Sequence, residues 1–258
     1  MENVLILRPL NGVFFLSFGI FALVFLVLSL ALRKTRESVR RWTLACLMLA
    51  ALAGFFVYKY CLSIDKPYAE IMAAAGKGGF SWWEELPLHL CNINLCLIPI
   101  AALTKKRSLM SFCFFMAPLG ALMALLMPSV GFSDYSILLP RMLGFYGTHF
   151  MVFFGGIALC SFGIYKPAYR DFARTLCMAF GLTFLIFLIN MAMRHFGLNA
   201  HANYFYCVEP ETNPLLNLFY KFIPVPFLYL LPAVLILLPY LSLVTLPFHL
   251  CEKKKVTA

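Results

Sequence analysis

Cys91 and His149 are two side chains whose types could carry out nucleophilic chemistry, and each lies near the start of an apolar segment. A cysteine thiolate attacks a carbonyl carbon, and an imidazole partner moves the proton. In apolar surroundings a thiol without such a partner stays protonated and inert. The pair therefore predicts acyl transfer, with Cys91 as nucleophile and His149 as base. A packing cysteine and a histidine bonded to a backbone carbonyl are the alternative interpretations.

Further polar side chains accompany this pair in segments that are otherwise apolar. Polar groups are costly in lipid and usually face a protein interior or a water-filled cavity. At the rise of an α-helix, Cys91 and His149 both fall about 7–11 Å below the expected outer surface. For the asparagines near this level, hydrogen bonding between helices is the alternative interpretation. We expect substrate-binding groups at His89, Asn92, Asn94, Asn190, Arg194 and Tyr204.

Helical spacing assigns the residues around Cys91 to different faces of the third expected span. His89 then lies about 200° around the axis from Cys91 and shares a face with Glu85 and Asn92. The partner of the Cys91 thiol is therefore expected on another helix, where His149 is the best candidate.

The composition places these residues in a membrane protein. Hydrophobic residues make up 62% of the 258 positions and charged residues only 12%, against about a quarter in soluble domains. The mean hydropathy of +0.86 agrees. A soluble fold of this size could not bury so much apolar surface, so lipid must cover part of it. These values exclude a cytosolic enzyme, a secreted disulfide scaffold and a disordered chain.

Seven segments are long and apolar enough to cross a bilayer, which takes about 20 residues of helix. Strands are not expected, because no segment alternates with period two and an open sheet would leave unpaired edges in lipid. The sequence therefore predicts an all-α membrane bundle of seven transmembrane helices that forms a single domain over residues 1–258. The expected spans lie near 11–32, 42–62, 86–104, 109–128, 142–164, 175–193 and 222–248.

Basic residues gather at alternate ends of these spans and orient the bundle. Fourteen of the 21 basic residues fall in the first, third and fifth loops and the C-terminal tail, and the opposite side holds seven basic and eight acidic residues. By the positive-inside rule, the N-terminus lies outside and the C-terminus is cytoplasmic. The net charge of +10 is therefore explained without nucleic acid as a partner. The fourteen are Arg33, Lys34, Arg36, Arg40, Arg41, Lys105, Lys106, Arg107, Lys166, Arg170, Arg174, Lys253, Lys254 and Lys255.

The cysteines and histidines indicate neither a metal ion nor a cofactor. His89 and Cys91 form an isolated H-x-C pair without the further ligands that a zinc site needs. Cys61 and Cys207 both fall on the expected outer side, so the sequence leaves a disulfide between them open.

Several of these residues resemble a known family. The residues that carry the resemblance are the run Glu85-Leu86-Pro87-Leu88-His89-Leu90-Cys91, His149, Asn190, Asn203-Tyr204, Pro224 and Pro226. They are similar to the YwaF-type bacterial integral membrane proteins and to their eukaryotic relatives, the transmembrane protein 164 lipid acyltransferases. The resemblance implies that Cys91 is a nucleophile and His149 its partner in moving a fatty acyl chain between phospholipids. It also implies a multi-pass protein of a bacterial cell membrane.

The expected topology narrows the substrates of such a reaction. A site that opens to the outer leaflet is out of reach of cytoplasmic acyl-CoA, so membrane phospholipids are the expected donor and acceptor. The sequence does not choose among a lysophospholipid, an ether lipid and a lipoprotein amine as the acceptor. It does not determine the oligomeric state either.

A transporter or binding protein for a small polar or lipid solute, using the same polar pocket, is the alternative function. The sequence lacks the inverted repeats and the polar track through the inner half that a transporter would favour. A seven-helix photoreceptor would need a lysine in the middle of its last span, and Lys221 lies at the outer end of that span.

Overall fold

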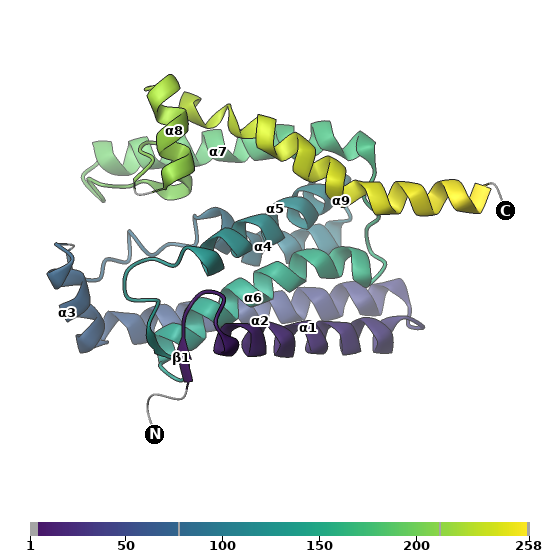
Figure 1. The fold of residues 1–258 in the computed structure, drawn as a ribbon, viewed down its shortest axis with the longest axis horizontal. Coiled ribbons are helices and arrows are strands. Elements are labelled where there is room, and N and C mark those ends of the chain that lie inside the picture. Colours follow the sequence, from purple (N-terminus) through teal and green to yellow (C-terminus); the bar gives the residue numbers. More distant parts are fainter. Residues whose placement is uncertain (1–4, 77, 212, 257–258) are drawn as a thin grey trace. The chain divides into compact units, whose positions relative to one another are not determined.

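A computed structural model describes residues 5–76, 78–211 and 213–256 of the chain (Figure 1). The chain divides into two compact units, which are described separately: unit 1 comprises residues 1–106 and 113–165, and unit 2 comprises residues 107–112 and 166–258. The expectation of a single domain stays a prediction. The side chains of Lys253, Lys254 and Lys255, part of the expected cytoplasmic cluster, lie outside the described part.

Unit 1 consists of helices and one minimal pair of strands. Its elements are β1 (Ile6–Leu7), α1 (Gly12–Leu32), α2 (Glu37–Ser63), α3 (Lys66–Ala74), α4 (Leu90–Thr104), α5 (Arg107–Leu126, shared with unit 2), β2 (Tyr135–Ser136) and α6 (Pro140–Ser161). The two strands pair antiparallel. Side-chain caps begin two of the helices: Asn11 accepts a hydrogen bond from the Phe14 N–H, and Asp65 accepts one from the Tyr68 N–H. Each cap satisfies an amide that the first helical turn leaves without a partner.

Unit 2 is also helical, and its prolines decide where its last long helix begins. Pro224, Pro226 and Pro232 have no N–H to donate, so the chain after α8 continues as irregular backbone and a short 3-10 turn. The last helix therefore begins well after residue 222, where the seventh span is expected to start. The elements are the 3-10 helices η2 (Tyr169–Asp171), η3 (Tyr204–Tyr206) and η4 (Leu228–Leu230) and the α-helices α7 (Phe172–His195), α8 (Pro214–Phe222) and α9 (Ala233–Val256).

Six helices in the described part are long and apolar enough to cross a membrane. This confirms the expectation of a helical, multi-pass membrane protein. Five of them coincide closely with expected spans, and the sixth is the last helix with its late start. The six are Gly12–Leu32, Glu37–Ser63, Arg107–Leu126, Pro140–Ser161, Tyr169–His195 and Leu228–Cys251.

The third expected span, 86–104, is shorter in the structure. Helix α4 begins at Leu90 and has 15 residues, about 22 Å of rise against a hydrocarbon core of about 30 Å. Pro87 keeps Leu86 out of the helical region, because the residue before a proline is restricted. A turn follows in which the Leu88 N–H donates to the Leu86 carbonyl at 2.7 Å, and α4 begins after it. His89 then adopts an extended conformation, with φ −73° and ψ 152°, as the N-cap.

The helical faces expected around Cys91 therefore need correction. Glu85 and His89 precede α4 and lie in turns and bends, so they do not share a helical face with Asn92. For the same reason, a depth counted from residue 86 at the helical rise does not apply to Cys91.

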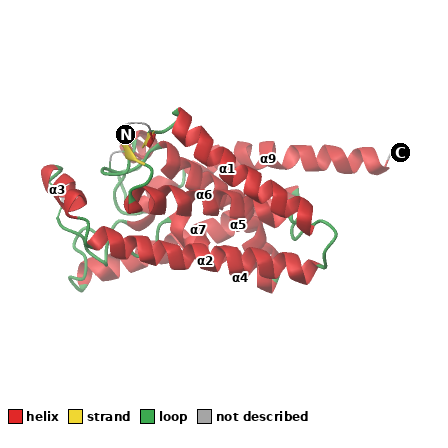
Figure 2. Cartoon of the chain, turned by 90° about the horizontal axis from the view of Figure 1, so that it is seen from below, coloured by secondary structure: helices red, strands yellow, loops and turns green. Residues whose placement is uncertain are grey.

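The core of unit 1 forms where α2 packs against α4 and α6, and α1 packs along α6 (Figures 1 and 2). Glycines permit the close approach of these helices. A Cβ atom on Gly144 would lie 2.2 Å from Cγ of Tyr58, and one on Gly156 would lie 2.8 Å from Cδ of Pro118. The first of these contacts brings the end of α2 against the part of α6 that carries His149.

Candidate active site

Cys91 is the second residue of α4, at the end of the helix where backbone N–H groups have no partner within the helix. The N–H groups of Cys91 and Asn92 are directed at the Cys91 sulfur, whose side chain is partly exposed. The amides and the helix dipole favour negative charge at this position. This environment suits a thiolate, and it suits the oxyanion of a tetrahedral intermediate equally well.

His149 lies on α6, which packs against α4, and is 5% exposed. Its Nδ1 atom lies 2.6 Å from the Phe145 carbonyl oxygen, one turn earlier. A carbonyl can only accept, so Nδ1 carries the proton and Nε2 holds the lone pair. The Phe145 ring, with its centroid 4.4 Å from that of the imidazole, holds the side chain in place. The carbonyl bond of the alternative interpretation is therefore present, and it leaves Nε2 in the form that a base requires.

A buried ion pair adjoins both residues and was not anticipated. Lys59 of α2 pairs with Glu85, and their side chains are 7% and 22% exposed. Lys59 interacts electrostatically with Cys91, His89 and His149. The signal for it in the sequence is a lysine inside an expected span, where a charged side chain is costly.

The other expected site residues of unit 1 differ in their surroundings. His89 caps α4 and interacts electrostatically with His149, which brings the two histidines and Cys91 into one cluster. Asn94 is fully buried and donates from Nδ2 to the Leu90 carbonyl at 2.6 Å. Its Oδ1 atom is buried without a partner, so Asn94 retains one hydrogen-bond acceptor. Asn92 is partly exposed on the first turn of α4.

Asn190 and Tyr204 form a structural contact within unit 2. Asn190 is fully buried; its Nδ2 atom donates to the Tyr204 carbonyl at 2.9 Å and its Oδ1 atom accepts from the Tyr204 N–H at 3.0 Å. Both ends of the amide are thus used to hold the loop after α7. The convergence of these residues on Cys91 stays a prediction, since the two units are described separately.

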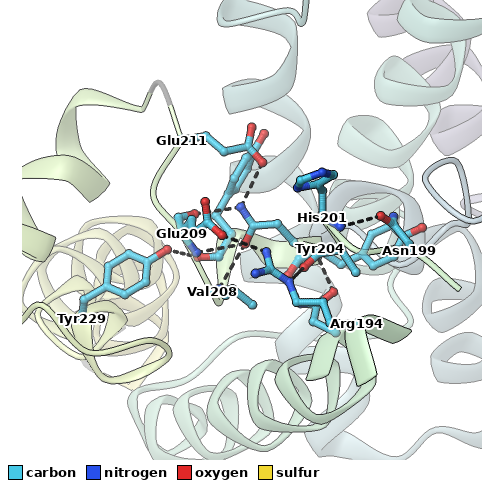
Figure 3. A network of polar contacts seen from close by, with 12 residues as sticks. Arg194, Asn199, His201, Tyr204, Val208, Glu209, Glu211 and Tyr229 are labelled. Atoms are coloured by element: carbon cyan, nitrogen blue, oxygen red, sulfur yellow. Dashed lines mark hydrogen bonds and ion pairs between the residues drawn. The ribbon is translucent and has the colours of Figure 1, made fainter. Parts of the chain in front are cut away.

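Arg194 belongs to the same loop network (Figure 3). Its guanidinium donates to the Ala202 carbonyl at 2.8 Å and pairs with Glu209 at 2.9 Å. Asn203 accepts from the Val208 and Glu209 N–H groups, both at 3.1 Å. The side chain of Arg194 therefore serves the loop, and its binding of substrate stays a prediction.

The nine cysteines, all in the described part of the chain, are free thiols, Cys61 and Cys207 included. Burial raises the pKa of the Cys207 thiol to about 12, and its Sγ atom lies 3.7 Å from the Thr183 carbonyl oxygen. Among the described residues, no group of three His, Cys, Asp or Glu side chains could hold a metal ion.

Comparison with known proteins gives one finding. The model of the TMEM164 family matches residues 9–245, which is most of the chain. No curated protein and no solved structure matched. The match spans the run around Cys91, His149 and the loop after α7. The chain therefore belongs to the TMEM164 family of membrane proteins.

Proposed function

We propose that this protein is a lipid acyltransferase that moves a fatty acyl chain from a phospholipid to a lysophospholipid-type acceptor. His149 takes the proton of the Cys91 thiol and becomes an imidazolium, and the thiolate attacks the acyl carbonyl carbon of the donor. A carbon–sulfur bond forms and the ester C–O bond breaks. The released lysophospholipid takes a proton from the His149 imidazolium. In the second half, His149 removes the proton of the acceptor hydroxyl, the acceptor oxygen attacks the thioester, and the Cys91 thiolate leaves.

The position of Cys91 on the first turn of α4 carries this proposal. Backbone N–H groups there have no helical partner, so they can bind the oxyanion that forms when the thiolate attacks. Cys91 as a residue is partly exposed, which the approach of a substrate requires.

His149 supports the proposal through its protonation state. Because Nδ1 donates to the Phe145 carbonyl, Nε2 is the atom that can accept a proton. Anchoring of a base through its other nitrogen is the arrangement that orients the histidine in nucleophilic enzymes. Shared proximity to Lys59 supports the pairing of Cys91 with His149.

We propose further that α4 and its flanking turns complete a seventh membrane crossing, with the N-terminus outside. The distribution of basic residues supports this orientation. The site would then open to the outer leaflet, where phospholipid is the available donor.

Acyl exchange in liposomes tests the function. Purified protein receives phospholipid with a labelled acyl chain and unlabelled lysophospholipid, and lipid mass spectrometry follows the label. Wild type should transfer label, while Cys91→Ala should not. The matched control is Cys96→Ala, which removes a thiol from the same helix and should retain transfer. Without acceptor, the wild type should accumulate an acyl group on Cys91.

Turnover by Cys91→Ala at the wild-type rate would contradict the cysteine mechanism. If wild type moves no label to lysophospholipid, ether-lipid or amine acceptors, the transporter interpretation becomes the leading one. Efflux of a polar solute from the same liposomes would then be measured.

A further inference from the structure

The ion pair between Lys59 and Glu85 lies in a place where an ion pair is expensive. Lys59 is on the apolar helix α2 and is 6% exposed, and the side chain of Glu85 is 22% exposed. Removing two charges from water costs several kcal/mol per ion, and apolar replacements of such pairs are often neutral or stabilising. Stability therefore does not explain the pair, and its neighbours have to be considered.

The ammonium group is closely confined. Its Nζ atom lies 4.6 Å from the centroid of the Tyr58 ring and 5.4 Å from that of Phe55, both on α2. Together with the bond to Glu85, these rings hold the positive charge at one place. Gly144 of α6 permits this arrangement, because a larger residue would collide with Tyr58.

Helix packing brings this place toward the reacting groups, because α2 packs against both α4 and α6 and Glu85 precedes Cys91 by six residues. Lys59 interacts electrostatically with Cys91, and separately with His89 and His149. An ammonium ion near a thiol favours its deprotonated form. The same charge opposes protonation of both imidazoles, which keeps His149 in the neutral form that accepts a proton.

Other titratable groups interact with these residues and contribute to their electrostatic environment. Tyr58 interacts with Cys91 and Glu85, and Tyr68 of α3 interacts with Glu85 and Lys59. Burial first, and then the Glu85 carboxylate, raises the pKa of the Tyr68 phenol. Tyr68 is therefore neutral at physiological pH. Lys59 and Tyr58 interact with the thiol itself, and the groups that interact with these two or with one another are Tyr68, Glu84, Glu85, His89 and His149.

We infer that Lys59, held in place by Glu85, is a positioning residue whose charge stabilises the Cys91 thiolate and the negative charge that develops on the attacked carbonyl oxygen. Glu85 has two effects in this arrangement: it fixes the ammonium group, and it partly neutralises its charge. This inference deepens the proposed function, on which its catalytic part rests.

The test measures the reactivity of the thiol, which does not depend on turnover. Purified protein in detergent micelles is treated with iodoacetamide between pH 6 and 11, and mass spectrometry follows modification at Cys91. Cys96, five residues further along α4 and about 7.5 Å away at the helical rise, is the internal control because it lies on the same peptide segment.

The inference predicts opposite shifts from the two partners. Lys59→Met should move the midpoint of the Cys91 profile to higher pH by about one unit, because the thiolate loses a nearby cation. Glu85→Gln should move it to lower pH, because the ammonium charge is no longer balanced. Lys59→Arg should keep the midpoint near the wild-type value. The Cys96 profile should stay the same in all variants.

Misfolding is controlled by a double variant. Removal of one partner from a buried pair is strongly destabilising, whereas removal of both is tolerated. Lys59→Met combined with Glu85→Gln should fold and should give a midpoint between those of wild type and Lys59→Met. Shifts of equal sign in the two single variants, or a Cys91 profile that no variant moves, would overturn the inference.

Acyl exchange separates this inference from the proposed function. Lys59→Met should transfer acyl chains about tenfold more slowly than wild type at pH 7, which corresponds to the same one-unit shift, and the difference should narrow as the pH rises. If the profiles shift as expected but wild type transfers no acyl chain, the proposed function fails and the role of Lys59 at the thiol stands. If acyl transfer occurs and the profiles do not shift, only this inference fails.

Discussion

The polar side chains of the two units are partnered in different ways. In unit 2, Asn190 gives both ends of its amide to the backbone of Tyr204, and Arg194 is bonded to a carbonyl and to Glu209. In unit 1, Lys59 and Glu85 satisfy each other, while His149 keeps Nε2 for a further partner. Side chains used by the backbone fix a loop, whereas side chains that neighbour one another and retain a reactive atom can perform chemistry.

Each of the two clusters also contains a cysteine, and the two cysteines differ in environment. Cys91 is partly exposed beside a lysine and at a helix N-terminus. Cys207 is fully buried, and burial raises its pKa to about 12. A thiol becomes a nucleophile only where its thiolate is stabilised, so the proposed function expects a reactive thiol at Cys91 and an inert one at Cys207.

The largest expected effect is the loss of this thiol. Cys91→Ala should lower the rate of acyl exchange on the order of 10³-fold or more, because the nucleophile is gone. Cys207→Ala is the comparison in unit 2 and should stay within about twofold, since the buried Cys207 thiol takes no part in the proposed reaction. Both rates are read by lipid mass spectrometry. Equal losses in the two variants would remove the distinction between the clusters.

Loss of the proposed base should have the next largest effect. His149→Ala should slow acyl exchange by about 10²-fold or more, the usual contribution of a general base. His201→Ala, in the exposed part of the unit 2 loop, should leave the rate unchanged. As the pH drops and Nε2 becomes protonated, the wild-type rate should decrease. The His149→Ala rate should not show this decrease.

Asn190 should affect stability more than activity. Asn190→Ala removes both buried hydrogen bonds that the Asn190 amide makes with the Tyr204 backbone, which should lower the free energy of unfolding by about 2–4 kcal/mol. Chemical denaturation in detergent micelles measures this change. Asn199→Ala, which removes an exposed bond to the His201 N–H at 2.9 Å, should cost less than about 0.5 kcal/mol. A folded Asn190→Ala protein without acyl exchange would instead indicate contact with substrate.

The helix contact beside Lys59 should be sensitive to a single methyl group. Gly144→Ala places its Cβ atom on Tyr58, so unit 1 must shift, at a cost of about 1–3 kcal/mol. Gly181→Ala in α7 meets nothing within 4 Å and should be neutral or stabilising by up to about 1 kcal/mol. Thermal unfolding of the two variants compares them. Equal melting temperatures would show that α2 and α6 do not pack closely at this point.

The smallest expected signal comes from Cys207. With a pKa of about 12, only about one thiol in 10⁴ is ionised at pH 8, so iodoacetamide should leave Cys207 unmodified in the folded protein. Modification should appear only as the pH approaches 12 or after denaturation. Labelling of Cys207 at pH 8 as fast as Cys91 would contradict the burial that separates the two thiols.

Much of the fold could be predicted because hydrophobicity is a property of long segments. A run such as residues 12–32 offers no alternative to a lipid-covered helix, whatever its neighbours are. The third expected span could not be placed correctly, because one proline decides where a helix of marginal length begins. Pro87 changes the mean hydropathy of the segment little, whereas it restricts the backbone conformation of the residue before it.

The sequence by itself determined the helical membrane architecture, the identity of Cys91 and His149 as candidates, and membership of a family whose pattern runs over most of the chain. Only the tertiary structure decided which atoms are available to react. The carbonyl that takes Nδ1 of His149, the glycine that admits Tyr58, and the meeting of Lys59 with Glu85 all depend on contacts between segments. Such contacts follow from how helices pack, and residue types along one helix do not specify the neighbours that another helix will bring.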